Sequence, residues 1–273
     1  MSTPRQMNSE SELSSLVFSR TFEKGVLPEI RQEQAQLGHV LMARDAELLQ
    51  QAACGEQGAI LRFYEWIRPT VSLGFHQAED ILDREAVKRE GIPWVRRPTG
   101  GAAVLHSQEL TYSLVLPSGH PLQREGSTLE HVGNALVRGL RALGVPAQLA
   151  QRSHPLENLP NRTSCFIRAS RWEVCVRGRK IVGSAQRLLN GALLQHGSIL
   201  CGPGHLHLAS LLRLPSQEVR RELLARLRAT ATSVTEELGS ALDMCELRNK
   251  MAEAFTEEFA SLSGTRELQL ANA

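Results

Sequence analysis

Three strand-like segments in a row, joined by short turns, constrain the fold more than any other feature of this chain. Residues 171–176 alternate between apolar and polar side chains, and Gly178 stands where a hairpin turn would fall. Residues 180–188 and 192–200 follow as two further strand-like segments. Neighbouring strands joined by such short turns run antiparallel. The sequence therefore predicts an antiparallel sheet in this part of the chain.

Strand-like and helical segments alternate along the rest of the chain. Further strands are predicted over residues 59–66, 70–75, 94–97, 103–105 and 110–116. Helices are predicted over residues 28–53, 79–90, 127–143, 216–227 and 243–259.

Two of these helices carry clear local patterns. Ser127 and Glu130 form a capping box in front of an apolar stripe. Leu247 begins a second stripe, in which apolar residues recur every four positions up to Phe259. The predicted fold class is α+β, with mixed, mostly antiparallel sheets flanked by helices and a short C-terminal helical segment. Residues 1–26 are expected to be a partly flexible extension, and residues 27–273 a single catalytic domain.

Composition and charge argue against several kinds of protein. The net charge of 31 − 29 = +2 gives no strong field that would attract nucleic acid. No apolar run reaches the roughly 18 residues of a membrane helix, and the first 26 residues lack the apolar core of a signal peptide. The five cysteines are odd in number and show no C-x-x-C spacing, so neither a disulfide framework nor a structural metal site is expected. A cytoplasmic protein that binds neither nucleic acid nor membrane is the expectation.

Gly100 and Gly101 offer bare backbone to a ligand. Paired glycines let a ligand approach the main chain and leave N–H groups free for an anion. From the glycines alone, a plain turn that needs positive φ is the commoner explanation. Arg97 and His106, which flank the pair, favour a binding role.

A second small-residue segment, Gly183-Ser184-Ala185, follows Lys180 in a predicted strand. Three small residues lose packing area unless a ligand fills the space. A lysine beside such a groove could bind a carboxylate or phosphate, or hold a thiolate, although a strand lysine is more commonly an exposed edge residue. His196-Gly197-Ser198 is predicted to form a second wall of the same groove, with only a positioning role for the histidine, because a lone histidine is more commonly structural.

Cys165 lies at the end of a polar stretch that carries two prolines, so a loop position is predicted. Catalytic residues tend to lie on loops. Only the thiolate of a cysteine attacks, and a neighbouring ammonium such as that of Lys180 would favour this form. Thioesters suit two-step acyl transfer. Cys175 and Cys201 lie in or after predicted strands and are expected to be packing residues.

Together these segments resemble the biotin/lipoate protein ligase and octanoyltransferase superfamily. The matching pieces occur in the family order, and each of them alone would be weak. They are residues 61–66, 69–74, 96–101, 104–106, 178–186 and 195–200. The resemblance implies the catalytic-domain fold of that superfamily.

Cys165 favours the LipM-type octanoyltransferase branch within the superfamily. Cys165-Phe166 precedes Lys180 by 180 − 165 = 15 residues, and Trp172-Glu173 lies between them, as in that branch. The ATP-dependent lipoate ligases make an acyl-adenylate and need no nucleophilic cysteine. They also usually show three glycines where this chain has Gly100-Gly101-Ala102.

The resemblance implies an octanoyltransferase of lipoate biosynthesis. Its donor would be octanoyl-acyl carrier protein, and its acceptor a lipoyl-domain lysine, expected on the glycine cleavage H protein. Cys165 would carry the acyl group as a thioester, and Lys180 would stabilise its thiolate. No cofactor, ATP or metal would be required, and a monomer is the simplest expectation. The residues expected to bind substrate are Arg97, Thr99, Gly100, Gly101, His106, Gly183, Ser184, Ala185, His196 and Gly197.

Three other functions remain open at this point. In an ATP-dependent lipoate ligase, Lys180 would bind the carboxylate of the acid or the phosphate of the adenylate, and Cys165 would be incidental. A related amidotransferase would move the chain between two lipoyl-bearing proteins. A non-catalytic acyl-binding or lipoyl-domain-binding module would need neither residue, so the presence of both argues against it.

Overall fold

The computed structural model describes residues 27–123, 128–150 and 172–271, and the surroundings of side chains up to residue 261. Its strands are β1 (Glu29–Gln32), β2 (Ile60–Tyr64), β3 (Thr70–Leu73), β4 (Trp94–Arg96), β5 (Val104–His106), β6 (Glu109–Leu116), β7 (Gln148–Leu149), β8 (Val174–Val176), β9 (Arg179–Leu189) and β10 (Ala192–Leu200). Its α-helices are α2 (Gly38–Ala53), α3 (Arg84–Arg89), α4 (Thr128–Ala142), α5 (Leu208–Leu211), α6 (Gln217–Thr230), α7 (Val234–Leu238) and α8 (Met244–Ala271). Short 3₁₀ helices are η1 (Glu79–Ile81), η2 (Pro121–Gln123) and η4 (Pro203–His207).

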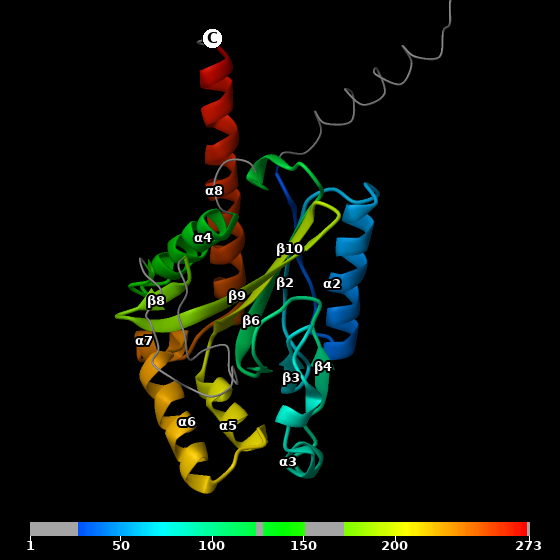
Figure 1. Ribbon diagram of the computed structural model, residues 1–273. Coiled ribbons are helices and arrows are strands. Elements are labelled where there is room, and N and C mark those ends of the chain that lie inside the picture. Colours follow the sequence, from blue (N-terminus) through cyan, green and yellow to red (C-terminus); the bar gives the residue numbers. More distant parts are fainter. Residues whose placement is uncertain (1–26, 124–127, 151–171, 272–273) are drawn as a thin grey trace, which may run out of the picture.

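The strands form two sheets (Figure 1). The larger sheet has the order β1-β2-β6-β10-β9-β8-β7, and the smaller has the order β4-β3-β5. Among the described strands, the β1–β2 and β3–β4 pairs are parallel, and the remaining named pairs are antiparallel. The predicted α+β fold, with mixed and mostly antiparallel sheets flanked by helices, is therefore confirmed.

Two tight turns set the register of the long antiparallel strands. The loop between β8 and β9 is Arg177-Gly178, with φ of 47° and 80°, and the loop between β9 and β10 is Asn190-Gly191, with φ of 48° and 85°. Two central residues with positive φ are typical of the type I′ turn, whose twist matches that of the flanking strands. The predicted turn at Gly178 is confirmed. The strand before it is shorter than predicted, because Trp172 has φ of 72° and β8 begins only at Val174.

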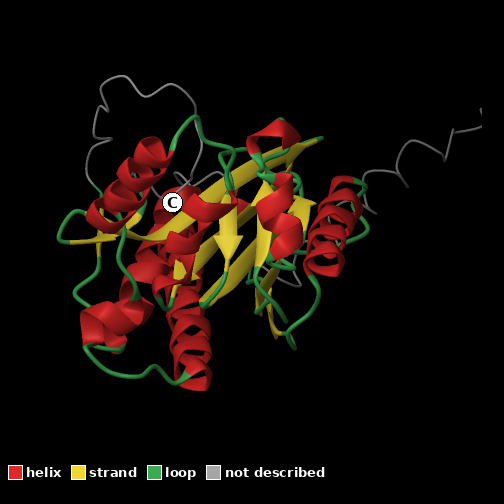
Figure 2. Cartoon of the chain, turned by 90° about the horizontal axis from the view of Figure 1, so that it is seen from below, coloured by secondary structure: helices red, strands yellow, loops and turns green. Residues whose placement is uncertain are grey.

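Helices cover both faces of the large sheet (Figure 2). On one face, α4 and α8 pack over β2, β6, β8 and β9 in the main core cluster. On the other face, Leu48, Leu49 and Ala52 of α2 pack on Ile60 and Leu194. The small sheet has its own core with α3, α5 and α6. The small sheet and α2 also contact each other, because Val95 of β4 packs against Leu41 and Met42 of α2.

The predicted apolar stripe of the last helix is confirmed. Leu247, Met251, Phe255 and Phe259 are all buried in the main core. They pack against α4, where a Cβ added at Gly139 would lie 2.7 Å from the sulfur of Met251. A glycine at this crossing allows the two helices to approach closely.

Two predicted helices differ in the structure. Residues 28–53 were predicted as one helix, but Glu29–Gln32 is strand β1, which pairs in parallel with β2, and the helix begins at Gly38. Residues 79–90 form a 3₁₀ turn and then α3, because Leu82 is extended and Asp83 accepts a hydrogen bond from the N–H of Ala86 as a new N-cap. Long-range strand pairing and a local cap thus outweigh helical periodicity. The capping serine proposed for α4, Ser127, lies outside the described residues.

Candidate active site

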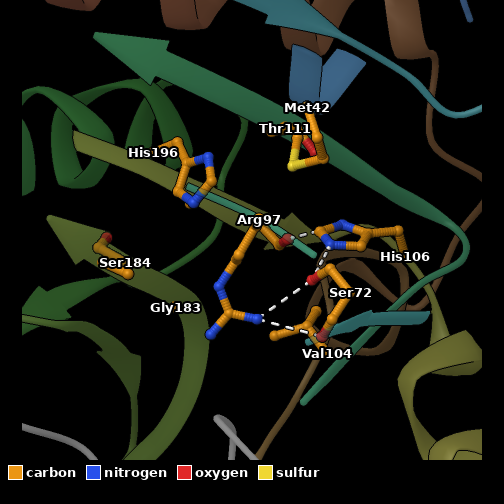
Figure 3. A pocket seen from close by; sticks show the side chains of 12 residues that line it. Met42, Ser72, Arg97, Val104, His106, Thr111, Gly183, Ser184 and His196 are labelled. Atoms are coloured by element: carbon orange, nitrogen blue, oxygen red, sulfur yellow. Dashed lines mark hydrogen bonds between the residues drawn. The ribbon is translucent and has the colours of Figure 1, made fainter. Parts of the chain in front are cut away.

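A narrow pocket of about 30 Å³ lies where the small sheet meets the middle of the large sheet (Figure 3). It is lined by Met42, Ser72, Arg97, Val104, His106, Thr111, Gly183, Ser184, Ala185, His196, Gly197 and Ser198. Seven of the twelve are residues that the sequence predicts to bind substrate. The flexible thioether of Met42 is the part of this lining that can adapt most readily to a ligand.

The two small-residue segments form the floor of the pocket. They are cross-strand neighbours, because His196 pairs with Ala185 and Gly197 pairs with Ser184 in the β10–β9 register. The hydroxyl of Ser184 is 2.6 Å from the hydroxyl of Tyr112. A Cβ at Gly197 would lie 2.4 Å from the carbonyl oxygen of Gly183, so packing between the strands alone requires a glycine there. The residues predicted to form a second wall therefore lie on β10, directly beside β9, and both strands belong to the floor of the pocket.

Arg97 fixes the glycine loop that follows β4. Its guanidinium is buried and donates to the carbonyl oxygens of Gly100 at 2.7 Å, Ala102 at 2.8 Å and Ser72 at 3.1 Å. Gly101 has φ of 97°, which explains that glycine as a turn residue. A Cβ at Gly100 would meet nothing within 4 Å, so neither packing nor a positive φ requires a glycine at this position. Arg97 therefore positions the loop through its hydrogen bonds.

Gly74 lies against this loop, and we expect Gly74→Ala to destabilise the protein. The added Cβ would lie 2.0 Å from the carbonyl oxygen of Gly101, so the loop would have to shift. Overpacking of this kind costs about 1–3 kcal/mol of unfolding free energy. Thermal unfolding measures the loss. Gly58→Ala is the matched control, since a Cβ there meets nothing within 4 Å; equal stability of both variants would contradict the close contact.

Asp45 of α2 is the centre of a buried polar network behind the pocket. Its carboxylate accepts hydrogen bonds from Arg62 at 2.5 Å, Tyr64 at 2.8 Å and Ser113 at 2.7 Å. It also lies 3.1 Å from Nδ1 of His196. Burial would raise the pKa of Asp45, but the hydrogen bond and charge of His196, the charge of Arg62 and the Ser113 hydroxyl lower it. The carboxylate is therefore held in its charged form.

His196 connects this network to the glycine loop. Its Nε2 lies 2.5 Å from the hydroxyl oxygen of Thr99, and its Nδ1 faces Asp45. All three side chains are buried. The ring thus joins α2, the floor strand and the residue before Gly100. The positioning role predicted for His196 agrees with these contacts, and Thr99 lies beside the pocket rather than among its lining residues.

His106 occupies the opposite wall. Its Nε2 is 2.8 Å from the hydroxyl oxygen of Ser72, and its Nδ1 is 3.2 Å from the carboxylate of Glu109 (the Ser72 contact is drawn in Figure 3). The indole of Trp66 stacks on the imidazole with ring centroids 3.8 Å apart. Burial lowers the pKa of His106, and Glu109 opposes this shift. The site thus holds a buried imidazole between an acid and a hydroxyl.

Lys180 lies outside the set of pocket-lining residues. Its ammonium donates to Glu173 with an Nζ–Oε1 distance of 2.5 Å, and the side chains are only 3% and 8% exposed. The commoner alternative, an exposed edge lysine, is therefore wrong. Cys165 lies outside the described residues, so its proposed proximity to Lys180 stays a prediction.

The other cysteines show no feature of a nucleophile. Burial raises the pKa of Cys175 to about 11, with a further contribution from Glu173. Burial also raises the pKa of Cys201. Both are buried in the core, as the sequence predicts, whereas Cys54 and Cys245 are exposed. None of these four lines the pocket.

Sequence reasoning missed Met42, Asp45, Ser72 and Glu109 as members of the site. Met42 and Asp45 lie within a helical pattern, and Ser72 lies within a short strand pattern. The available signal was the polarity of Asp45, because this residue lies four positions after Leu41 and three before Leu48, where helical periodicity assigns the core. Ser72 alternates with Val71 and Leu73, so its pattern gave no such signal. A charged or hydroxyl side chain at a core position needs a partner, and that partner marks the site.

The described part of the chain contains neither a metal-binding cluster nor a membrane-spanning helix. Residues 27–123, 128–150 and 172–271 contain no group of three or more His, Cys, Asp or Glu side chains placed to hold a metal ion. Within the same residues, no helix combines the length and apolar character needed to cross a membrane.

Comparisons with known proteins agree on one family. The lipoyl protein ligase A/B catalytic domain family matches residues 38–256. The octanoyltransferase LipM of Moorella thermoacetica is 40% identical over 222 residues, covering 80% of this chain and 81% of that protein. The octanoyltransferase LipM of Bacillus subtilis is 35% identical, covering 78% and 80%.

Solved structures share the fold at lower identity. A bipartite lipoate protein ligase from Thermoplasma acidophilum, analysed with its E2 lipoyl domain, has a TM-score of 0.62 at 24% identity and covers 88% of this chain and 91% of that chain. LipL1 of P. falciparum in complex with lipoate has a TM-score of 0.63 at 16% identity and covers 86% and 63%. At these identities the likeness concerns the fold alone.

Proposed function

The chain belongs to the lipoyl protein ligase A/B catalytic domain family, and on this basis we propose that it is the octanoyltransferase of lipoate biosynthesis. Its similarity to octanoyltransferases shows that it is an acyltransferase. The proposed donor is octanoyl-acyl carrier protein, and the proposed acceptor is a lipoyl-domain lysine on the glycine cleavage H protein. The observation that carries the proposal is the similarity to octanoyltransferases over most of both chains.

The proposed reaction has two steps and one covalent intermediate. The thiolate of Cys165 attacks the carbonyl carbon of the donor thioester, the new C–S bond forms, and the carrier leaves as its thiolate. The amine of the acceptor lysine then attacks the enzyme thioester, so that an amide forms and the Cys165 thiolate is released. The octanoyl chain lies along the floor strands and beside Gly100, where the space next to the backbone supports close approach of a ligand.

The test is transfer without nucleotide. The protein is mixed with octanoyl-acyl carrier protein and apo H protein, and octanoylated H protein is measured by mass. We expect product in the absence of ATP. If product appeared only with free octanoate or lipoate plus ATP, and pyrophosphate were released, the chain would instead act as a ligase.

Lys180→Met should slow the first step and destabilise the fold. We propose that the Lys180 ammonium favours the Cys165 thiolate, so its removal should raise the pKa of Cys165 and slow acylation. The same change removes the cation that the buried Glu173 binds, which costs about 3–5 kcal/mol. The pH dependence of alkylation of Cys165 by iodoacetamide reports the pKa, in variants that lack the exposed cysteines.

A double variant separates the two effects. Lys180→Met with Glu173→Leu removes both charges, so most of the lost stability should return. Its acylation rate should stay low, because the ammonium is still absent. Recovery of the wild-type rate in the double variant would show that Lys180 acts only on stability.

A further inference from the structure

A chain of hydrogen bonds runs through the wall of the pocket, and the carboxylate of Glu109 fixes its direction. At one end the indole N–H of Trp66 donates to the Thr111 hydroxyl at 2.9 Å, and that hydroxyl donates to Oε1 of Glu109 at 2.7 Å. At the other end the guanidinium of Arg97 donates to the Ser72 hydroxyl oxygen at 3.1 Å. Indole and guanidinium N–H groups only donate and an ionised carboxylate only accepts, so the Thr111 proton points to Glu109 and the Ser72 oxygen accepts from Arg97.

His106 joins the two ends. An ionised carboxylate such as that of Glu109 only accepts, so in the neutral ring the proton lies on Nδ1, and Nε2 accepts from the Ser72 hydroxyl 2.8 Å away. The proton on Nδ1 is then directed to Oε1 of Glu109 at 3.2 Å, with the Ser198 hydroxyl 3.3 Å from the same nitrogen. The imidazole is therefore held with its basic lone pair on Nε2, behind a serine that lines the pocket.

We propose that Ser72, His106 and Glu109 form a proton relay for the amine that attacks the acyl thioester. This inference rests on the proposed function. As the C–N bond forms and the C–S bond breaks, the attacking nitrogen gives one proton to the Ser72 oxygen. The Ser72 proton passes to Nε2 of His106, and the imidazolium faces Glu109. The thiolate leaves, and the imidazolium later returns its proton to that thiolate or to water.

The geometry leaves room for this step. A hydroxyl oxygen has two acceptor lone pairs, and Ser72 uses one for Arg97. The second can accept from an amine, and both Ser72 and His106 line the pocket. Burial, together with the charges of Arg97 and His196, lowers the pKa of His106, while Glu109 raises it. The imidazole is thus a neutral base at neutral pH.

Glu109 is hard to explain as a packing residue. Its side chain is only 1% exposed, and within the described residues its Oε2 has no hydrogen-bond partner. A buried carboxylate whose oxygens are incompletely paired costs stability, and a neutral residue would serve packing better. A carboxylate beside His106 stabilises the imidazole when the ring becomes positively charged, and the relay requires such a charged ring.

Glu109→Gln tests the relay when the two half-reactions are measured separately. Acylation from octanoyl-acyl carrier protein should stay at the wild-type rate, while transfer to the H-protein lysine should fall about 100-fold, the usual size of general-base catalysis. Loss of the Glu109 charge should also move the acid limb of the transfer rate to lower pH, because Glu109 raises the pKa of His106. Hydroxylamine attacks thioesters readily without a base, so it should deacylate the variant as fast as the wild type.

Two further variants keep the test decisive. Ser72→Ala should give the same selective loss of lysine transfer. Glu258→Gln is the matched control, because Glu258 is a buried carboxylate 3.5 Å from His131 and away from the pocket, and it should change neither half-reaction. Equal loss of both half-reactions, or an unchanged acid limb in Glu109→Gln, would overturn the relay. Failure of the proposed function is distinguishable, since the wild type would then form no acyl-enzyme.

Discussion

Replacing Cys165 by alanine should lower the rate of octanoyl transfer at least about 1000-fold. Without its covalent nucleophile, the enzyme can accelerate the reaction only by binding the substrates and polarising the thioester carbonyl. The thiol is the group on which both proposed steps depend. The measurement is the rate at which apo H protein becomes octanoylated from octanoyl-acyl carrier protein. The loss should appear without a change in thermal unfolding.

Another cysteine supplies the control for this variant. Cys245 is exposed in the first turn of α8, so Cys245→Ala should transfer octanoyl at the wild-type rate. Transfer by Cys165→Ala at the wild-type rate would contradict the thioester mechanism. It would favour the ligase chemistry, in which an adenylate carries the acyl group.

The second large effect concerns Asp45, and Asp45→Ala should cost about 3–5 kcal/mol of unfolding free energy. The change removes the acceptor of Arg62, Tyr64 and Ser113, and the carboxylate that faces His196. Donors left buried without an acceptor carry the full cost of their lost hydration. Denaturant unfolding measures the loss, and the exposed Asp80→Asn should leave stability unchanged. A cost below about 1 kcal/mol, the scale of one ordinary hydrogen bond, would contradict this role.

The same residue predicts how stability depends on pH. The folded protein lowers the pKa of Asp45 below its usual 3.8, so the charged form contributes stability that is fully present above that value. This contribution is lost as pH falls through the lower folded pKa. As the pH is lowered below 3.8, the unfolding free energy of Asp45→Asn should therefore fall less than that of the wild type. Parallel curves for the two proteins would contradict the lowered pKa.

Parts of the fold could be predicted because their determinants are local. The turn at Gly178 and the four-residue spacing from Leu247 to Phe259 each depend on residues close in sequence. Strand β1 could not be predicted, because Glu29–Gln32 is extended only through its pairing with β2. This contact joins segments that are distant in sequence, and only β2 carries a strand pattern of its own.

The candidate site was predictable in part for the same reason. Small-residue segments mark places where backbone lies bare, and residues 183–185 and 196–197 do meet in one pocket, whereas Gly100 and Gly101 are not among its lining residues. The partners that fix the polar side chains come from other elements: Asp45 for His196, and Ser72 for His106. Such pairs depend on how α2 and the small sheet pack on the large sheet, which no single segment encodes. Cys165 stays a prediction from sequence, since it lies outside the described residues.

The most direct test of the central claim is the intact mass of the protein after mixing with octanoyl-acyl carrier protein, without ATP or acceptor. The wild type should gain the mass of one octanoyl group, and hydroxylamine should remove it, as expected of a thioester on Cys165. Cys165→Ser should show no adduct that hydroxylamine removes. An unchanged wild-type mass, with acyl transfer seen only when ATP and a free acid are supplied, would contradict the account.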